Sequence, residues 1–264
     1  MKNYETYHTL ANHWSGMQFP VRPSPEEIRL CYELLTPYRG RNILILGSTP
    51  ELRDIGFEMG MHVTCADINP DMLHGMKQLM KNPNEKEKLV ECNWLSLPFA
   101  QQSFSVVAGD HSNNIIPFKE FATFYTNVRR VLKADGVFIN HVVVSRNERE
   151  ESIIEKHHIK HYDIHYLYDK LISLFYDGKT HEADFKAFGE HFDILLAQGK
   201  VTEEDHMAFF KYYGSFCEAG FKLWALSPDA FAKAMSTHFS IYDLRYAADY
   251  DKHNRHPFFV LKQH

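Results

Sequence analysis

The sequence predicts an α/β fold built on a mostly parallel sheet, and two apolar runs carry most of the prediction. The run Asn42–Leu46 ends at Gly47 and is followed at once by a helix-start signal at Thr49 and Pro50. A second run, Met61–Ala66, ends at Asp67. A strand, a turn, a helix and a second strand ending in a carboxylate are typical of the first half of a nucleotide-binding α/β sheet.

The remaining elements follow in order along the chain. Ser24 with Glu27 forms a helix-start signal, and an apolar stripe follows it as far as Pro37. Asn69 and Pro70 begin a helix that we expect to end near Asn82. The further strands are expected at 42–46, 62–66, 88–92, 104–109 and 137–144, with an aromatic-rich helix over 118–132 and a turn at 134–136. This alternation of strands and helices predicts right-handed crossovers between parallel strands.

The composition changes after residue 145, and this change sets the expected domain organisation. Residues 146–236 are charged and rich in His, Phe and Tyr, whereas strand patterns return at 239–245 and 257–262. We therefore expect an N-terminal helical cap over 1–40, a core formed by 41–145 and 237–264, and a helical insertion over 146–236 between strands five and six. An insertion there lies above the carboxyl edge of the sheet, where it can serve as a lid or substrate pocket.

Bulk properties exclude several classes of protein. The 264 residues carry 44% hydrophobic and 24% charged side chains and a net charge of −5, which gives no reason to expect a nucleic-acid or membrane partner. No apolar run approaches membrane length, and the first residues lack a signal-peptide core. The four cysteines are scattered without paired spacing, which favours a reducing compartment. We expect a cytoplasmic protein.

The loop after the first strand indicates which nucleotide to expect. Dinucleotide-binding loops carry glycines that allow the backbone to approach a pyrophosphate, but here only Gly47 is present, with Thr49 and Glu51 at later positions. S-adenosylmethionine has no phosphate and carries a sulfonium cation, so the loop favours this molecule over NAD. Ser48 and Glu51 also match a capping box, which would give Glu51 a purely structural role.

Several segments in one order resemble a class I S-adenosylmethionine-dependent methyltransferase. They are Ile43–Gly47, Asp67, Asn93–Phe99, Phe104–Asp110 and Val131–Phe138, and together they cover about residues 40 to 145. The chain departs from the family pattern at Ile45, Thr49, Glu51 and Asn93. The resemblance implies a Rossmann-like methyltransferase fold with a seven-stranded sheet, and S-adenosyl-L-methionine as the cofactor.

The resemblance also implies a set of cofactor-binding residues. Asp67 would hold the ribose hydroxyls, although its charge could instead serve the start of the following helix. Asn93 would meet the adenine edge, and Trp94 would pack near the ring or belong to the core. Arg22 could pair with the methionine carboxylate or be a solvated linker residue. The complete expected set is Gly47, Ser48, Thr49, Asp67, Ile68, Asn93, Trp94, Asp110 and Arg22.

Candidate catalytic residues lie at the ends of the fourth and fifth strands and in the insertion. Asp110 and His111 stand where the family binds the methionine moiety and often performs its chemistry. Asn140 and His141 point to opposite faces of their strand, so one could reach the pocket while the other is a core polar group. Tyr176 or Tyr168 could line the pocket from the insertion. Aromatic cover for the sulfonium could come from Tyr4, Tyr7 and Trp14, and Asn113 and Asn114 could simply form a turn.

The histidines of the insertion do not predict a metal centre. His157, His161 and His165 recur at helical spacing, but the pattern of a zinc-binding helix is missing and the neighbouring Lys and Tyr suit a solvated face. We expect no metal.

Three functions remain open from the sequence. The first is methyl transfer to a small-molecule acceptor whose nucleophile is deprotonated by Asp110 or His111. The second keeps the cofactor but attacks its aminobutyrate carbon, by transfer or cyclisation, and so releases methylthioadenosine. The third is a non-catalytic S-adenosylmethionine-binding module, against which the retained acid at Asp67 argues.

Overall fold

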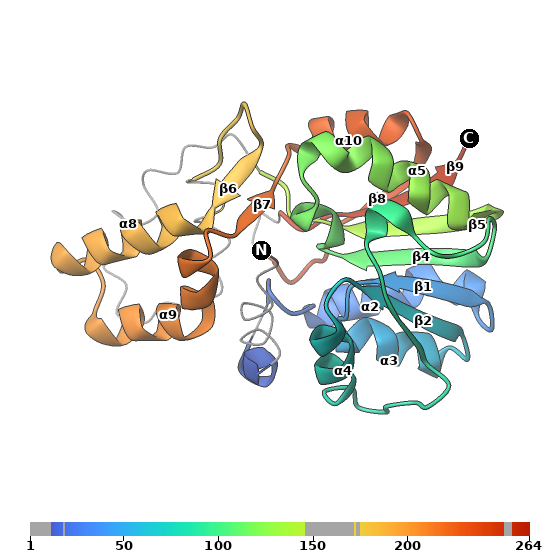
Figure 1. Cartoon of the computed structure of the whole chain (residues 1–264), viewed down its shortest axis with the longest axis horizontal. Helices are drawn as coiled ribbons and strands as arrows, with labels where there is room; N and C mark the ends of the chain where they lie inside the picture. Colours follow the sequence, from blue (N-terminus) through green and yellow to red (C-terminus); the bar gives the residue numbers. More distant parts are fainter. Residues whose placement is uncertain (1–11, 18, 146–171, 173–174, 251–254) are drawn as a thin grey trace.

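A seven-stranded sheet forms the centre of the protein, in the order β3-β2-β1-β4-β5-β9-β8 (Figure 1). The computed structural model describes residues 12–17, 19–145, 172, 175–250 and 255–264. Strands β1 to β5 pair in parallel, and β9 pairs antiparallel with both β5 and β8. The predicted Rossmann-like, mostly parallel sheet is confirmed.

The bounds of the elements are as follows. The strands are β1 Asn42–Leu46, β2 His62–Asp67, β3 Lys88–Glu91, β4 Phe104–Asp110, β5 Leu132–His141, β6 Glu182–Asp184, β7 Lys222–Trp224, β8 Phe239–Arg245 and β9 Phe258–Gln263. The α-helices are α2 Pro25–Leu35, α3 Pro50–Glu58, α4 Pro70–Lys77, α5 Phe121–Val131, α8 Phe185–Ala197, α9 Glu203–Glu218 and α10 Pro228–Ser236. Short 3-10 turns are η1 Trp14–Gly16, η2 Thr36–Tyr38, η3 Trp94–Ser96, η4 Ser112–Ile115 and η5 Phe118–Glu120.

Local sequence signals explain where the helices begin. Ser24 accepts a hydrogen bond from the Glu27 backbone, and the Glu27 side chain bonds back to Ser24, so the predicted capping box of α2 is present. Asn69 caps α4 by accepting bonds from the first turn. Thr49 is the N-cap of α3 without a side-chain bond, and the alternative capping box of Ser48 and Glu51 does not form.

Helices cover both faces of the sheet and enclose two apolar cores (Figure 1). One core lies under α5 and α10 and includes Leu44, Phe124 and Phe231. The other lies under α2 and α3 and includes Ile43 and Ile55. Strands β1 and β4 are almost entirely apolar and buried, as expected for central parallel strands with both faces covered.

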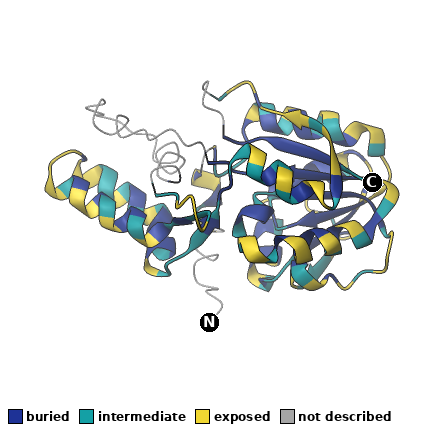
Figure 2. Cartoon of the chain, turned by 90° about the horizontal axis from the view of Figure 1, so that it is seen from above, coloured by how far each residue is buried: buried dark blue, intermediate teal, exposed yellow. Residues whose placement is uncertain are grey.

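The insertion has a small core of its own. Helices α8 and α9 pack on each other beside the two-stranded antiparallel sheet of β6 and β7, and they lie to one side of the large sheet (Figures 1 and 2). Their shared core is aromatic, with Phe188, Phe192 and Phe209 fully buried. Helix α10, within the range that the sequence assigns to the insertion, instead packs against α5 and β8.

The structure corrects several expected boundaries. Strand β5 begins at Leu132 and ends at His141. The turn expected at 134–136 is instead an irregularity within this strand: Phe104 pairs with Leu132, but Val106, two residues later on β4, pairs with Val137, five residues later on β5. Helix α4 ends at Lys77 rather than near Asn82. The insertion contains strands as well as helices. The predictions for Tyr4, Tyr7, His157, His161, His165 and Tyr168 lie outside the described residues. In the described part of the chain, no helix is long and apolar enough to cross a membrane.

Candidate functional site

The loop from β1 to α3 lies at the carboxyl edge of the sheet and lines a cavity. Gly47 has a φ of 102°, which side chains rarely adopt, and a Cβ atom there would meet nothing nearer than the Trp94 ring at 4.0 Å. The Ser48 hydroxyl donates to Asp67 Oδ2 at 3.2 Å, and the Thr49 hydroxyl donates to Asp110 Oδ2 at 2.9 Å. The loop therefore ties the ends of β2 and β4 together.

Asp67 stands at the end of β2 and faces this cavity. Its Oδ1 accepts a hydrogen bond at 3.0 Å from the backbone N–H of Asn69, the N-cap residue of α4. Burial raises the pKa of Asp67 to about 6, against the lowering effect of the bonds from Asn69 and Ser48. A half-buried carboxylate that lines a cavity can still accept hydrogen bonds from a ligand.

A buried chain of charged groups supports Asp110. His141 places Nδ1 2.7 Å from Asp110 Oδ1 and Nε2 3.0 Å from Glu27 Oε1, while its ring stacks on Phe258. Burial acts to lower the pKa of His141, but Glu27 and Asp110 outweigh it and raise that pKa to about 10. Burial would raise the pKa of Asp110, yet the bond from His141 and the nearby His111 keep it low. Asp110 is therefore ionised, and the His141 ring is its buried ion-pair partner.

His111 follows Asp110 in a left-handed conformation with a φ of 53°, which is uncommon for a residue other than glycine. Its backbone N–H donates to His141 O at 2.9 Å, and its carbonyl accepts from Asn114 at 3.0 Å. The half-buried side chain lines the cavity. Burial lowers the pKa of His111 to about 3 despite the attraction of Asp110, so the imidazole is neutral and keeps a lone pair on one ring nitrogen.

The N-terminal segment closes one side of the cavity. Trp14 lines it and packs with Met72 and Met76 of α4. Arg22 forms an ion pair with Glu51, with Nε 2.9 Å from Oε1, and lies over the Trp14 ring at 5.6 Å. Arg22 thus has an acidic protein partner, and it is not among the described residues that line the cavity.

Four other predicted residues do not line the cavity. Asn93 is exposed, and its Oδ1 accepts from the Leu95 backbone. Ile68 is half-buried next to Asp67. Asn140 is fully buried below the cavity and donates to Asn113 Oδ1 at 3.1 Å. The Tyr176 hydroxyl is hydrogen-bonded to His181 Nδ1 at 2.6 Å.

Trp94, Asn113 and Asn114 combine structural roles with proximity to the site. The Trp94 indole donates to Ala66 O at 2.9 Å, and its ring is both part of the core and a wall of the cavity. Asn113 accepts bonds from Asn140 and from Tyr125. Asn114 bonds to the backbone of Val143 and Trp224, so it joins the insertion to the end of β5. These asparagines do more than form a turn.

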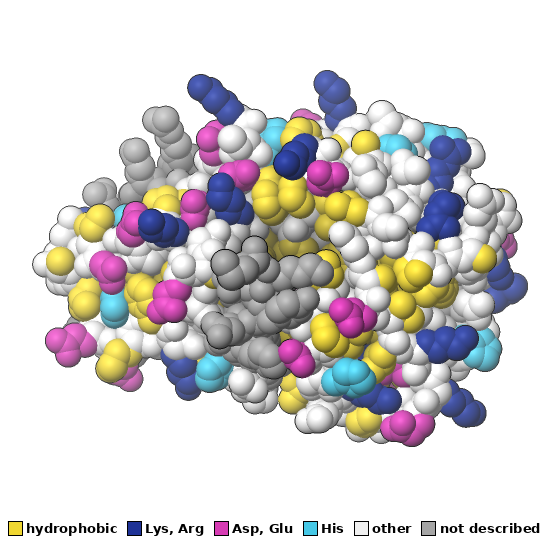
Figure 3. Space-filling model, in the orientation of Figure 1, with side chains coloured by type: hydrophobic (Ala, Val, Ile, Leu, Met, Phe, Trp, Pro, Cys, Tyr) yellow, Lys and Arg dark blue, Asp and Glu magenta, His cyan; other side chains and the backbone are white. Residues whose placement is uncertain are grey.

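The cavity has two walls of different chemistry. Its polar wall consists of Ser48, Thr49, Asp67, Asp110, His111 and Ser112. Its opposite wall belongs to the insertion and is apolar and aromatic: Phe185, Tyr213, Phe216, Phe221 and Leu223. In Figure 3, hydrophobic side chains gather between the large sheet and the α8–α9 unit. Sequence reasoning missed these aromatic residues as part of a site, because core aromatics show the same spacing.

Comparison with known proteins agrees with this geometry. Residues 47–140 match the family model described as "Methyltransferase domain". No curated protein matches the chain. Similar solved structures include a protein of Rhodobacter sphaeroides named as a candidate Zn-dependent alcohol dehydrogenase, with 14% identity, coverage of 99% of this chain and 98% of that one, and a TM-score of 0.69.

Two methyltransferases are also similar in structure. The CcbJ methyltransferase of Streptomyces caelestis has 12% identity, coverage of 100% and 99%, and a TM-score of 0.65. The 1,6-didemethyltoxoflavin-N1-methyltransferase of Burkholderia thailandensis, solved with 1,6-didemethyltoxoflavin and S-adenosylhomocysteine, has 12% identity, coverage of 100% and 91%, and a TM-score of 0.56. At such identities the likeness shows the fold.

The fold, and the cavity at the carboxyl edge of its sheet, are those of a Rossmann-like α/β protein. The chain has the Rossmann-like methyltransferase fold and carries a methyltransferase domain over residues 47–140, in agreement with the class I S-adenosylmethionine-dependent methyltransferase family that its sequence resembles. S-adenosylmethionine is its cofactor. The residues fit this molecule: Gly47 leaves room at the loop, and the carboxylates of Asp67 and Asp110 line the cavity at the ends of β2 and β4.

Proposed function

We propose that this enzyme methylates a small, largely apolar molecule held between His111 and the insertion. The observation that carries the proposal is the division of the cavity into two walls. Ser48, Asp67 and Asp110 supply the polar wall, whereas every described residue of the insertion that lines the cavity is aromatic or aliphatic. Apolar walls with a few polar groups are typical of sites for small molecules.

The cofactor wall would hold the nucleoside. Asp67 accepts hydrogen bonds from the ribose hydroxyls, and these replace the hydrogen bond that it accepts from Ser48. The Trp94 ring lies beside Gly47. S-adenosylmethionine, when bound, supplies an electrophilic methyl group on a positively charged sulfur. The ionised Asp110 and the Trp14 ring give this end of the cavity the negative potential that suits a cation.

His111 would be the base at the acceptor end. The acceptor nucleophile forms a bond to the methyl carbon, the electrons of the sulfur–carbon bond return to sulfur, and the proton of the nucleophile passes to the His111 imidazole. Asp110 stabilises the imidazolium that results, because its carboxylate is adjacent and ionised. In this proposal Asn140 and Tyr176, which lie outside the cavity wall, support the fold around the site.

The test uses purified protein and S-adenosylmethionine, with and without a cell extract depleted of macromolecules. S-adenosylhomocysteine that forms only with extract, identified by mass spectrometry, supports the proposal. Methylthioadenosine would instead support transfer of the aminobutyrate group and would overturn methyl transfer as the reaction.

Variants test the role of His111. We expect His111→Ala to lower turnover by about 10²–10⁴-fold while S-adenosylmethionine affinity changes little. His62→Ala, an exposed histidine at the start of β2, is the matched control and should retain full turnover. Wild-type turnover in His111→Ala would remove this histidine from the mechanism.

The free state of the four cysteines supports the proposal that the protein works in the cytoplasm.

A further inference from the structure

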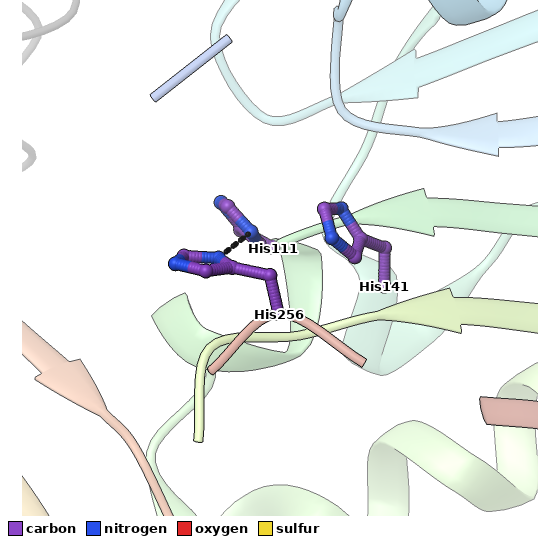
Figure 4. A group of neighbouring side chains, drawn as sticks. All are labelled: His111, His141 and His256. Atoms are coloured by element: carbon purple, nitrogen blue, oxygen red, sulfur yellow. Dashed lines mark hydrogen bonds between the residues drawn. The ribbon is translucent and has the colours of Figure 1, made fainter. Parts of the chain in front are cut away.

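Three histidines from distant parts of the chain converge next to the cavity (Figure 4). His111 follows β4, His141 ends β5, and His256 precedes β9. One nitrogen from each lies within 4.8 Å of the others. His256 is completely buried, and no sequence pattern singles it out.

His141 is already engaged through both ring nitrogens. Its Nδ1 lies 2.7 Å from Asp110 Oδ1, and its Nε2 lies 3.0 Å from Glu27 Oε1. To bind a metal ion, this ring would have to give up one of these carboxylates. Zinc sites use at least three protein ligands. Within this cluster His111 and His256 are in hydrogen-bond contact, whereas both nitrogens of His141 face carboxylates, so the described residues favour a hydrogen-bonded pair over a metal centre.

The contact within the pair is direct. His256 Nδ1 lies 3.3 Å from His111 Nε2, and the second nitrogen of each ring points away from the partner (Figure 4). A neutral imidazole carries one N–H and one lone pair, so the hydrogen bond made by one nitrogen decides the state of the other. If His111 donates from Nε2, its Nδ1 is a free acceptor. If His256 donates instead, His111 Nδ1 carries the hydrogen and cannot act as a base.

The backbone of His111 has an unusual conformation that fixes the position of its side chain. A left-handed conformation at a residue other than glycine persists only where surrounding contacts maintain it, and such residues cluster at functional sites. Here the contacts include backbone bonds to His141 and Asn114. The side chain is therefore delivered to the cavity wall at one fixed orientation, with His256 against one nitrogen.

We propose that His256 is a positioning residue that accepts a hydrogen bond from His111 Nε2–H and thereby leaves Nδ1 of His111 as the base for the acceptor. This inference rests on the proposed role of His111 in methyl transfer. His256 itself contacts no reacting atom. Its contribution is to select one tautomer and one ring orientation before the acceptor binds.

The experiment observes the tautomer directly. Protein labelled with ¹⁵N-histidine is saturated with S-adenosylmethionine, and long-range ¹H–¹⁵N correlation spectra identify which nitrogen of each ring is protonated. In the wild type we expect His111 to be protonated at Nε2. In His256→Phe we expect a mixture of tautomers and a turnover, in the extract assay, that is about tenfold lower. His256→Asn, which keeps an acceptor near the Nδ1 position, should restore the single tautomer and most of the turnover.

Two internal checks distinguish a change in the His111 tautomer from a general loss of folded structure. His141 should remain protonated at both nitrogens in every variant, which reports that its pocket is intact. His238→Phe, a half-buried histidine beside Tyr125, is the matched control and should leave His111 unchanged.

Three results would overturn the inference: protonation of His111 at Nδ1 in the wild type, an unchanged tautomer in His256→Phe, or stoichiometric Zn²⁺ binding that shifts His111 and His256 together. Because the spectra need no acceptor, they can refute the pairing even where methyl transfer is confirmed. Conversely, failure to form S-adenosylhomocysteine would refute the function and leave the pairing measurable.

Discussion

The ionisation of Asp67 should control how tightly the enzyme binds S-adenosylmethionine. Burial raises the pKa of this carboxyl group to about 6, so the free protein holds a proton there at lower pH. Hydrogen bonds from ribose hydroxyls need the carboxylate form. The affinity should therefore be complete well above pH 6 and should be lost as the pH falls through 6.

The size of the effect follows from this pKa. Relative to pH 8, the apparent Kd should rise about twofold at pH 6 and about tenfold at pH 5. Neighbouring groups should not contribute in this range. The pKa of His111 is lowered to about 3 and that of His141 is raised to about 10, while the pKa of Asp110 is held low.

Isothermal titration calorimetry between pH 5 and pH 8 measures this dependence. In Asp67→Asn we expect an affinity about 10 to 100 times lower, because charge-assisted hydrogen bonds are lost, and a pH profile without the Asp67 component. Titration of S-adenosylmethionine itself is common to both proteins and cancels in the comparison. Asp229→Asn, an exposed acid in the first turn of α10, should behave as the wild type. An equal pH dependence in wild type and Asp67→Asn would refute the reasoning.

Three further predictions concern stability and the loop. Arg53 and Glu87 form a fully buried, two-pronged ion pair, with both contacts at 2.7 Å, so Glu87→Gln should lower the free energy of unfolding in urea by about 3–5 kcal/mol. Gly47→Ala should cost about 1 kcal/mol or more and weaken S-adenosylmethionine binding in calorimetry, because its φ of 102° strains any side chain. The raised pKa of His141 stabilises the fold fully below pH 6.5, and this stability is lost between pH 6.5 and 10, by about 5 kcal/mol at most. Urea unfolding of His141→Gln should show a weaker alkaline loss, and an identical pH profile would contradict the assigned ion pairs.

Much of the sheet could be predicted because its information is local. Central parallel strands are covered on both faces, so β1 and β4 appear in the sequence as short apolar runs. Residues directly after such runs must lie at the carboxyl edge, and this rule found Gly47, Asp67 and Asp110. The capping box at Ser24 and Glu27 likewise needs only four consecutive residues.

Boundaries and the insertion were harder to predict because they depend on partners. Strand β5 extends back to Leu132 because that residue pairs with Phe104, and nothing near it in the sequence signals the pairing. Strands β6 and β7 are three residues each and exist only through each other. Arg22 was expected to pair with the methionine carboxylate of the cofactor. In the structure it pairs with Glu51, and this pairing depends on where α3 places the Glu51 side chain.

By itself the sequence determined the class of fold, the cofactor and the edge of the sheet where the cavity lies. Only the tertiary structure decided which side chains meet there. His256 lies 145 residues from His111 along the chain, and the Glu27 carboxylate approaches His141 from another helix. The physical reason is range: periodicity and capping act within a few residues, whereas a buried hydrogen bond or ion pair is fixed by the packing of the whole sheet against its helices.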